Sequence, residues 1–461
     1  MTRFSKSFAL RGLVSAFALA CTLNFIGTAN ADILIKNVTL YDGTGKAPVK
    51  AANILVKGER IAQISTSTIQ PGTATVIDGT GKFVMPGLID SHIHVRGGQG
   101  GPVFAGNNRT PINEPEAAKP TLVGFIYSGV TAMLDSANNE PFIYPMRDLE
   151  RAGKIVSPRL FVVGGAISVP DGTGAGPTAL KVTTWDEARK GLDDKFTRKP
   201  DMLKMILTEP AAEGKKQTPS LTSEQIKNVT DYARQHGLRV TAHAMVETTS
   251  TQAITNGVAA LAHSVLRGPP LTDAYLKMLV ERKIPVSTTT VGFATIGKLA
   301  DENGMAYLDD RLFKDTFTAD DFAAARGTER DNYIKFGVTA SFKAGEAQAL
   351  ANIKKLYDAG VILTSGTDKA QGPYIHMELA FLNKAGIPAP ALIRIGTLNG
   401  AIYMGQEKDI GSVETGKYAD LLLLHADPGA GVKNFQTIDE VIKSGQRIDL
   451  AKLDLPVNHK K

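Results

Sequence analysis

The sequence predicts an α/β fold: a (β/α)₈ barrel of the TIM type, joined to a small β-sandwich built from both chain ends. Two observations carry this prediction. Through the middle of the chain, short apolar runs alternate with amphipathic stretches, a pattern typical of parallel strands with helices outside. At both ends the runs are strand-like and separated by glycines. The length of 461 residues, 43% of them hydrophobic, accommodates one large barrel and a smaller unit.

The first residues have the features of an export signal. Three basic residues precede an apolar run at 13–25, and Ala-Asn-Ala at 29–31 supplies the small residues that a signal peptidase needs. We therefore expect residues 1–31 to be removed and the mature chain to be periplasmic or secreted. The apolar run is shorter than the ~20 residues needed to cross a bilayer, so no stable membrane anchor is expected.

Cys21 leaves one alternative open, because it follows Leu19 and Ala20 as a lipoprotein cysteine would. Against this, Ala18 stands where a bulky aliphatic residue is usual. Without the signal the chain has no thiol, so its metal ligands must be histidines and carboxylates. The formal charge falls from +6 to +3, which is too small to indicate nucleic acid or an anionic membrane as a partner.

Strand-like runs occupy both ends of the mature chain. They lie at 33–35, 38–40, 53–56 and 60–64, and again at 419–424 and 438–441. Neither end supplies many strands alone. We therefore expect residues 32–85 and 406–461 to form one β-sandwich together.

Residues 86–405 are expected to form the barrel. The eight strand candidates, the first of which begins just before this range, are 83–95, 130–135, 159–163, 202–207, 240–244, 259–264, 284–289 and 361–367. Helices are predicted between them, among others at 223–236, 274–282, 345–359 and 389–398. The excursion at 293–344 is longer than an ordinary connection, and 318–325 has the pattern of a capped helix, which would suit a lid.

Candidate metal ligands gather at the carboxyl ends of the predicted strands, where barrel enzymes carry their catalytic groups. The first strand ends in His92 and His94, which share one face because they are two residues apart. Strands four, five, six and eight end in or beside Lys204, His243, His263 and Asp368. A lone buried histidine is usually a hydrogen-bonded core residue. Here, however, the chain has only eight histidines and four of them lie at predicted strand ends, which favours a metal site.

Several motifs resemble those of the amidohydrolase superfamily. Residues 84–94, VMPGLIDSHIH, are similar to its opening metal motif, and 240–244, 262–264 and 365–368 to its later ligand segments. Residues 410–421 are similar to its closing segment in the small β domain. The resemblance covers nearly the whole mature chain. Within the superfamily it is strongest to imidazolonepropionase-like proteins and metal-dependent Xaa-Pro dipeptidases.

The resemblance implies a site for two divalent metal ions, with zinc favoured by the ligand types. His92, His94 and Asp368 would hold one metal, His243 and His263 the other, and a carboxylated Lys204 would bridge them. An ammonium among the apolar residues of 202–206 is costly, which favours the neutral amine that can add CO₂. The alternative is that Lys204 pairs with a neighbouring carboxylate.

The expected reaction is hydrolysis by metal-activated water, with Asp368 moving the proton. The substrate would be a small amide such as a dipeptide or an N-acyl amino acid. A cyclic amide or lactone is the alternative, and a non-catalytic metal-holding protein is a third. His376 and Arg267 are candidate substrate contacts, although packing and solvent exposure are competing explanations. Formation of a homo-oligomer is left open.

Two departures from the family pattern concern the substrate side. Leu134 stands where relatives often have an arginine, before Asp135 at the end of strand two. The stretch at 164–174 lacks the histidine that many relatives have after strand three. Both leave the metal ligands intact and bear on substrate identity.

Overall fold

A computed structural model describes residues 31–100, 108–211, 216–266 and 268–459. The expected signal peptide with Cys21, and the candidate substrate residue Arg267, lie outside these ranges. Within the described ranges, no helix combines the length and the apolar character that crossing a membrane requires.

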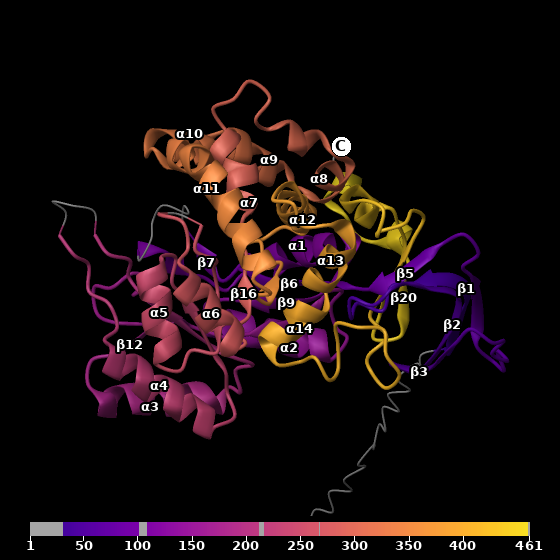
Figure 1. Cartoon of the computed structure of the whole chain (residues 1–461), viewed down its shortest axis with the longest axis horizontal. Coiled ribbons are helices and arrows are strands. Elements are labelled where there is room, and N and C mark those ends of the chain that lie inside the picture. Colours follow the sequence, from indigo (N-terminus) through magenta and orange to yellow (C-terminus); the bar gives the residue numbers. More distant parts are fainter. Residues whose placement is uncertain (1–30, 101–107, 212–215, 267, 460–461) are drawn as a thin grey trace, which may run out of the picture.

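The two chain ends meet in one mixed sheet of eight strands, ordered β20-β19-β18-β5-β1-β2-β3 with β4 paired to β1. Figure 1 shows the indigo N-terminal strands beside the yellow C-terminal segment. The strands are β1 (Ile33–Leu40), β2 (Val49–Lys57), β3 (Arg60–Ser65), β4 (Thr75–Asp78), β5 (Phe83–Pro86), β18 (Leu421–Leu424), β19 (Ile438–Lys443) and β20 (Gln446–Ile448). The chain ends thus share a sheet, while the predicted division into two packed layers stays a prediction.

Strand β18 is buried on both faces, which explains its run of four leucines. It pairs antiparallel with β5, with Leu421 opposite Pro86 and Leu424 opposite Phe83. Leu421 and Leu423 pack into the core of the terminal sheet. Leu422 and Leu424 belong instead to the main core under the parallel strands. This strand therefore joins the hydrophobic cores of the two parts of the molecule.

The middle of the chain forms parallel sheets, which confirms the predicted α/β class. One sheet has the order β10-β9-β6 and the other β12-β11-β13-β14-β15-β16-β17. The predicted core strands correspond to β6 (Leu88–Ile93), β9 (Val130–Asp135), β10 (Arg159–Val162), β13 (Leu203–Ile206), β14 (Val240–His243), β15 (Ala260–Leu261), β16 (Val286–Ser287) and β17 (Leu363–Thr364). The first of them was predicted as one strand over 83–95, but the chain leaves the terminal sheet at Gly87, so that 83–86 is β5 and only β6 joins the parallel strands. The short strands β11 (Ile167–Ser168) and β12 (Leu180–Lys181) were not predicted.

Backbone hydrogen bonds connect the two parallel sheets at both of their ends. The amide of Asp201, just before β13, donates to Val162 O of β10 at 2.9 Å. On the other side, the amide of Ser91 in β6 donates to Ser365 O at 3.0 Å, and that of Asp368 donates to His92 O at 2.7 Å. The segment after β17 therefore lies beside the first core strand.

Helices separate the parallel strands along the chain. They include α1 (Pro115–Tyr127), α2 (Glu140–Arg151), α3 (Trp185–Thr197), α4 (Ser223–Gln235), α5 (Glu247–Thr255) and α6 (Asp273–Glu281). Three more, α12 (Tyr374–Lys384), α13 (Ala389–Ile395) and α14 (Leu398–Met404), follow the last parallel strand, β17. The helix predicted at 389–398 is in fact two helices, interrupted at Gly396 and Thr397. Thr397 has φ −136° and ψ −91°, which no helix accommodates.

The long excursion before β17 is largely helical. It contains α7 (Val291–Ala294), α8 (Arg311–Thr316), α9 (Ala319–Arg326), α10 (Thr328–Lys335) and α11 (Val338–Asp358), and Figure 1 shows α9, α10 and α11 gathered together. The predicted capped helix is α9, where Thr318 and Asp321 form a reciprocal capping box. Asp321 also accepts hydrogen bonds from Arg96 and, at 2.9 Å, from Gln371 Nε2. One buried carboxylate thus ties the excursion to the segments that follow β6 and β17.

Candidate metal centre

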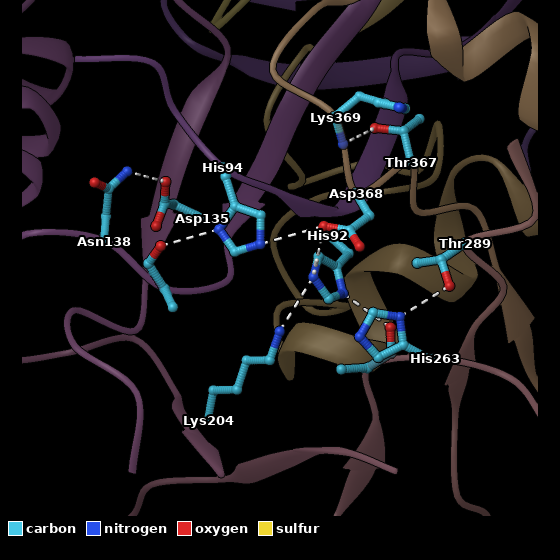
Figure 2. Close-up of polar contacts among 12 residues, drawn as sticks. His92, His94, Asp135, Asn138, Lys204, His263, Thr289, Thr367, Asp368 and Lys369 are labelled. Carbon is cyan, nitrogen blue, oxygen red and sulfur yellow. Dashed lines mark hydrogen bonds and ion pairs between the residues drawn. The ribbon is translucent and has the colours of Figure 1, made fainter. Parts of the chain in front are cut away.

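His92 and His94 lie at the end of β6 with their ring orientations fixed by backbone carbonyls. His92 Nδ1 donates to Ala262 O at 2.8 Å, and His94 Nδ1 donates to Ala137 O at 2.9 Å. These bonds leave Nε2 of each ring as the nitrogen that can bind a cation. Figure 2 shows both rings directed toward Asp368.

Asp368 faces both histidines from the segment after β17. Its Oδ1 lies 3.2 Å from His94 Nε2 and 3.6 Å from His92 Nε2. Its backbone has φ 53°, a left-handed conformation that is uncommon outside glycine, asparagine and aspartate. The side chain is 44% exposed, so the carboxylate reaches the open mouth of the site.

Asp90 connects the end of β6, which carries the two histidines, to the segment after β17, which carries Asp368. Its Oδ1 accepts hydrogen bonds from the amides of His92 at 3.2 Å and Thr367 at 3.0 Å, and its Oδ2 accepts one from Thr367 Oγ1 at 2.7 Å. Asp90 is fully buried, and this burial raises its pKa to about 8. The clamp sets the spacing between the His92–His94 pair and Asp368.

Lys204 projects from β13 toward the same point. Its Nζ lies 3.1 Å from His92 Nε2 (Figure 2), and the residue is 3% exposed. Burial lowers the pKa of Lys204 to about 8, although Asp368 and Asp135 favour the charged form. The lysine predicted at the end of strand four therefore lies against a predicted metal ligand.

His243 and His263 complete the cluster from β14 and the segment after β15. The ring of His263 lies 4.6 Å from that of His92 and 4.5 Å from that of His243, between ring centroids. His263 Nδ1 lies 3.0 Å from Thr289 Oγ1. Burial, with the nearby charge of Lys204, lowers the pKa of His243 to about 4 and holds that of His263 well below its usual range. Both imidazoles are therefore neutral near pH 7.

The donor set fits a metal. One nitrogen from each of His92 and His94 and one oxygen from Asp368 all lie within 4.8 Å of one another. Neutral imidazole and carboxylate are ligands that zinc and similar divalent ions commonly take in proteins. Nδ1 of His92 and of His94 is engaged by a carbonyl, as metal-binding histidines usually require.

The end of strand two supports the loop after His94. Asp135 Oδ2 accepts hydrogen bonds from the Val95 amide at 2.7 Å and from Asn138 Nδ2 at 2.9 Å. Leu134, at the position where relatives often have an arginine, is fully buried in an apolar cluster. This residue contributes to packing in the present chain.

His376, a candidate substrate contact, lies elsewhere. It is 4% exposed in α12, and its Nε2 donates to Ser128 O at 2.9 Å, at the end of α1. Burial lowers its pKa to about 4. These contacts are those of a packed helix–helix interface, which was the alternative explanation for this residue, and they give no support to a substrate role.

Two cavities in the described parts of the chain lie away from the histidine cluster. One, of about 560 Å³, is lined by residues of three segments, among them Tyr41, Leu363 and Arg394. The other, of about 680 Å³, lies between α2 and the end of α3 and is lined mainly by charged residues. Neither contains a predicted ligand.

Comparison with known proteins identifies the family. Residues 83–448 match the Amidohydrolase family. The chain belongs to that family. It is therefore a hydrolase of the class that acts on carbon–nitrogen bonds, and the predicted family and enzyme class are confirmed.

Relatives of this amidohydrolase differ in how much of their length is matched. The imidazolonepropionase of Micrococcus luteus is 24% identical over 410 residues, 85% of this chain and 92% of that protein. The imidazolonepropionase of Streptomyces griseus subsp. griseus is 29% identical over 110 residues, only 24% of this chain and 26% of that protein. A solved Xaa-Pro dipeptidase with bound methionine has a TM-score of 0.70 at 22% identity, covering 91% of this chain and 100% of that one.

Sequence analysis missed the residues that support the ligands. Asp90 lies inside the motif at 84–94 but drew no separate role, and Thr289 lies at the predicted end of strand seven. Spacing along the chain carries no signal for these residues, because their roles depend on contacts between distant segments.

Proposed function

We propose that this amidohydrolase is an exported enzyme with two metal ions that hydrolyses the amide or peptide bond of a small substrate. The observation that carries the proposal is that side chains from separate strands meet at one place. Six side chains from five separate strand ends, which are His92, His94, Lys204, His243, His263 and Asp368, form one linked cluster. Histidines placed for packing alone would have no reason to collect at one end of a parallel sheet.

In this proposal His92, His94 and Asp368 hold one metal, and His243 and His263 hold the other. Zinc is the metal that these ligand types favour. When bound, the metals would lower the pKa of water and polarise the carbonyl group of the substrate.

Lys204 would bridge the two metals as a carbamate. Its Nζ contacts His92 Nε2 at 3.1 Å, a position where an ammonium would repel any cation held by that imidazole. Addition of CO₂ to the neutral amine, with release of one amine proton to solvent, would convert the group into an anionic carbamate with two oxygens. The change replaces a buried cation with a ligand of suitable charge.

Asp368 would act as the general base. Its carboxylate touches His94 and is open to the mouth of the site, so it can both bind and exchange a proton with water. It would accept the proton of the attacking water and return it to the leaving amine. A protein that only held metals would not need an exposed carboxylate able to exchange protons with water, which argues against the non-catalytic alternative.

Two substrate classes are supported by different relatives. Similarity in fold to a Xaa-Pro dipeptidase supports a linear dipeptide or N-acyl amino acid, the substrate that we propose. Similarity along most of the chain to an imidazolonepropionase supports a cyclic amide or a lactone as the second candidate. Arg267 remains a proposed contact for a substrate carboxylate.

We also propose that the two parallel sheets close into one (β/α)₈ barrel over residues 86–405, and that 32–85 and 406–461 form a β-sandwich. The hydrogen bonds from Asp201 to Val162 and from Ser91 to Ser365 support closure. Export rests on the signal pattern of residues 1–31, and the mass of the mature protein, starting at Asp32, tests it.

Metal analysis combined with a substrate screen tests the enzymatic proposal. Purified protein should contain about two divalent ions per chain, and removing them should abolish activity that zinc, manganese or cobalt restores. Xaa-Pro dipeptides and N-acyl amino acids should be hydrolysed faster than imidazolones, hydantoins and lactones. Lys204→Ala should lose metal and activity together, with partial rescue by acetate or propionate. One ion per chain, or full turnover in Lys204→Ala, would contradict the bridged pair.

A further inference from the structure

Glu378 of α12 carries a buried carboxylate that contacts the segment just after β16, on both sides of Thr289. Glu378 is fully buried, and its Oε1 accepts hydrogen bonds from the hydroxyl of Thr288 and, at 2.9 Å, from the amide of Thr290. Burying a carboxyl group is costly unless it is well hydrogen-bonded. The two bonds fix the backbone immediately before and after Thr289.

Thr289 itself has an unusual backbone. Its φ is 46°, in the left-handed region that a β-branched residue rarely adopts. Such a conformation persists only where the surrounding structure holds it, and it is found most often at functional sites. The contacts of Glu378 supply that restraint.

The consequence of this conformation is the contact with His263. Thr289 Oγ1 lies 3.0 Å from His263 Nδ1 (Figure 2), and Ser264 Oγ donates to Thr288 O at 2.7 Å. The ends of strands six and seven are therefore joined at two adjacent points. A hydroxyl that accepts from Nδ1 leaves His263 Nε2 free for a cation.

We propose that Thr289 is a positioning residue for His263, and that Glu378 keeps Thr289 in its left-handed conformation. The inference rests on the proposed metal-dependent function, because His263 is there a ligand of the second metal. Glu378 and Thr289 would then raise the affinity of that site for its metal. Any effect of these residues on fold stability is measured separately.

The hydroxyl of Thr289 can be removed without changing side-chain shape or backbone strain. Thr289→Val does this, Thr289→Ser keeps the hydroxyl, and Thr295→Val is a matched control. Thr295 lies on the same segment and is 2% exposed, whereas Thr289 is half-buried, and the Thr295 hydroxyl donates to Val291 O. Zinc affinity is measured by competition with a chromogenic chelator, and the thermal midpoint is measured on metal-free protein.

Thr289→Val should bind one of two zinc ions about 10- to 100-fold more weakly. Thr289→Ser and Thr295→Val should bind both ions within about threefold of the wild type. Equal zinc affinity in Thr289→Val and the wild type would overturn the inference. So would a loss of affinity that Thr289→Ser shares. If the wild type itself binds fewer than two ions, it is the proposed function that fails, and the two failures are distinguishable.

Glu378 provides the second arm of the experiment. Glu378→Gln keeps an oxygen that can accept from Thr288 and Thr290, so its zinc affinity should match the wild type. Glu378→Ala removes the acceptor and should weaken the same zinc ion as Thr289→Val does, with no further loss in the double variant. Additive losses in the double variant would show that Glu378 does not act through Thr289. If Glu378→Ala does not fold, a tenfold loss of zinc affinity in Glu378→Gln serves as the contradicting result.

Discussion

At the scale of single residues, the proposed division of labour at the site is clearest for Asp368. The residue combines a left-handed backbone, contact with His94 Nε2 and an exposed carboxylate. Metal binding uses the negative oxygen, whereas catalysis needs a group that can be protonated and deprotonated. A substitution can separate these two properties, because asparagine keeps a carbonyl oxygen but cannot accept a proton at neutral pH.

Asp368→Asn should therefore fold normally and keep much of its metal while turning over at least about a hundredfold more slowly. Asparagine also tolerates a φ of 53°, so the backbone should not change. The measurements are kcat with saturating substrate, metal content by elemental analysis and the thermal midpoint. A loss of less than tenfold with metal retained would show that Asp368 is only a ligand.

At the level of residues, the sequence motifs indicated which side chains would lie close together, while the roles of these residues as ligands stay a prediction. The structure brings His92, His94, His243, His263, Lys204 and Asp368 together, as their positions at strand ends indicated. It could not succeed for His376, whose contact with Ser128 depends on how α12 packs against α1. Thr289 and Glu378 were invisible for the same reason, since neither a positive φ nor a contact between segments leaves a local pattern.

At the scale of elements, the strands were predicted more accurately than their connections. The apolar run at 130–135 is β9 to the residue, because both faces of that strand are buried. Helix α11 instead begins at Val338, seven residues before the predicted start, since its early turns contain polar residues that lie against other helices of the excursion. Strands β11 and β12 have two residues each, too few for a period to be recognised.

The excursion itself is held near the site through Asp321 of α9. Asp321→Ala should cost about 1–3 kcal/mol, because it removes one half of the capping box and the acceptor of Arg96 and Gln371. Limited proteolysis should cut residues 291–358 faster than in the wild type. Asp320→Ala is the control, since Asp320 is exposed in the same helical turn and should change stability by less than about 0.5 kcal/mol. Equal cleavage rates in the two variants would contradict a tethering role.

At the scale of the whole molecule, β18 links the core of the terminal sheet to the main core, which contains side chains of the parallel strands. Leu422 is fully buried in the main core, close to Gly129 at the start of β9, where an added Cβ would lie 3.0 Å from the Leu422 side chain. A defect at this strand should therefore be felt by both parts of the fold. If the two parts are coupled in this way, the protein should unfold in a single transition.

Leu422→Ala should lower the free energy of unfolding by about 2–5 kcal/mol, through lost burial and the cavity left behind. Leu149→Ala, at a position that is 36% exposed, is the matched control and should change it by less than about 1 kcal/mol. Urea unfolding followed by circular dichroism measures both. Two separate transitions, with only one shifted in Leu422→Ala, would show that the terminal sheet and the parallel sheets unfold independently.

The pairing of β5 with β18 also has a consequence for how the chain is made. During synthesis, β1, β2, β3 and β5 leave the ribosome long before Leu421–Leu424 exist, so the edge of β5 that will pair with β18 is open in every nascent chain. An open apolar edge invites pairing with another molecule. The terminal sheet therefore cannot be completed until the last residues have been synthesised. A nascent chain whose synthesis halts before β18 should depend on chaperones to stay soluble.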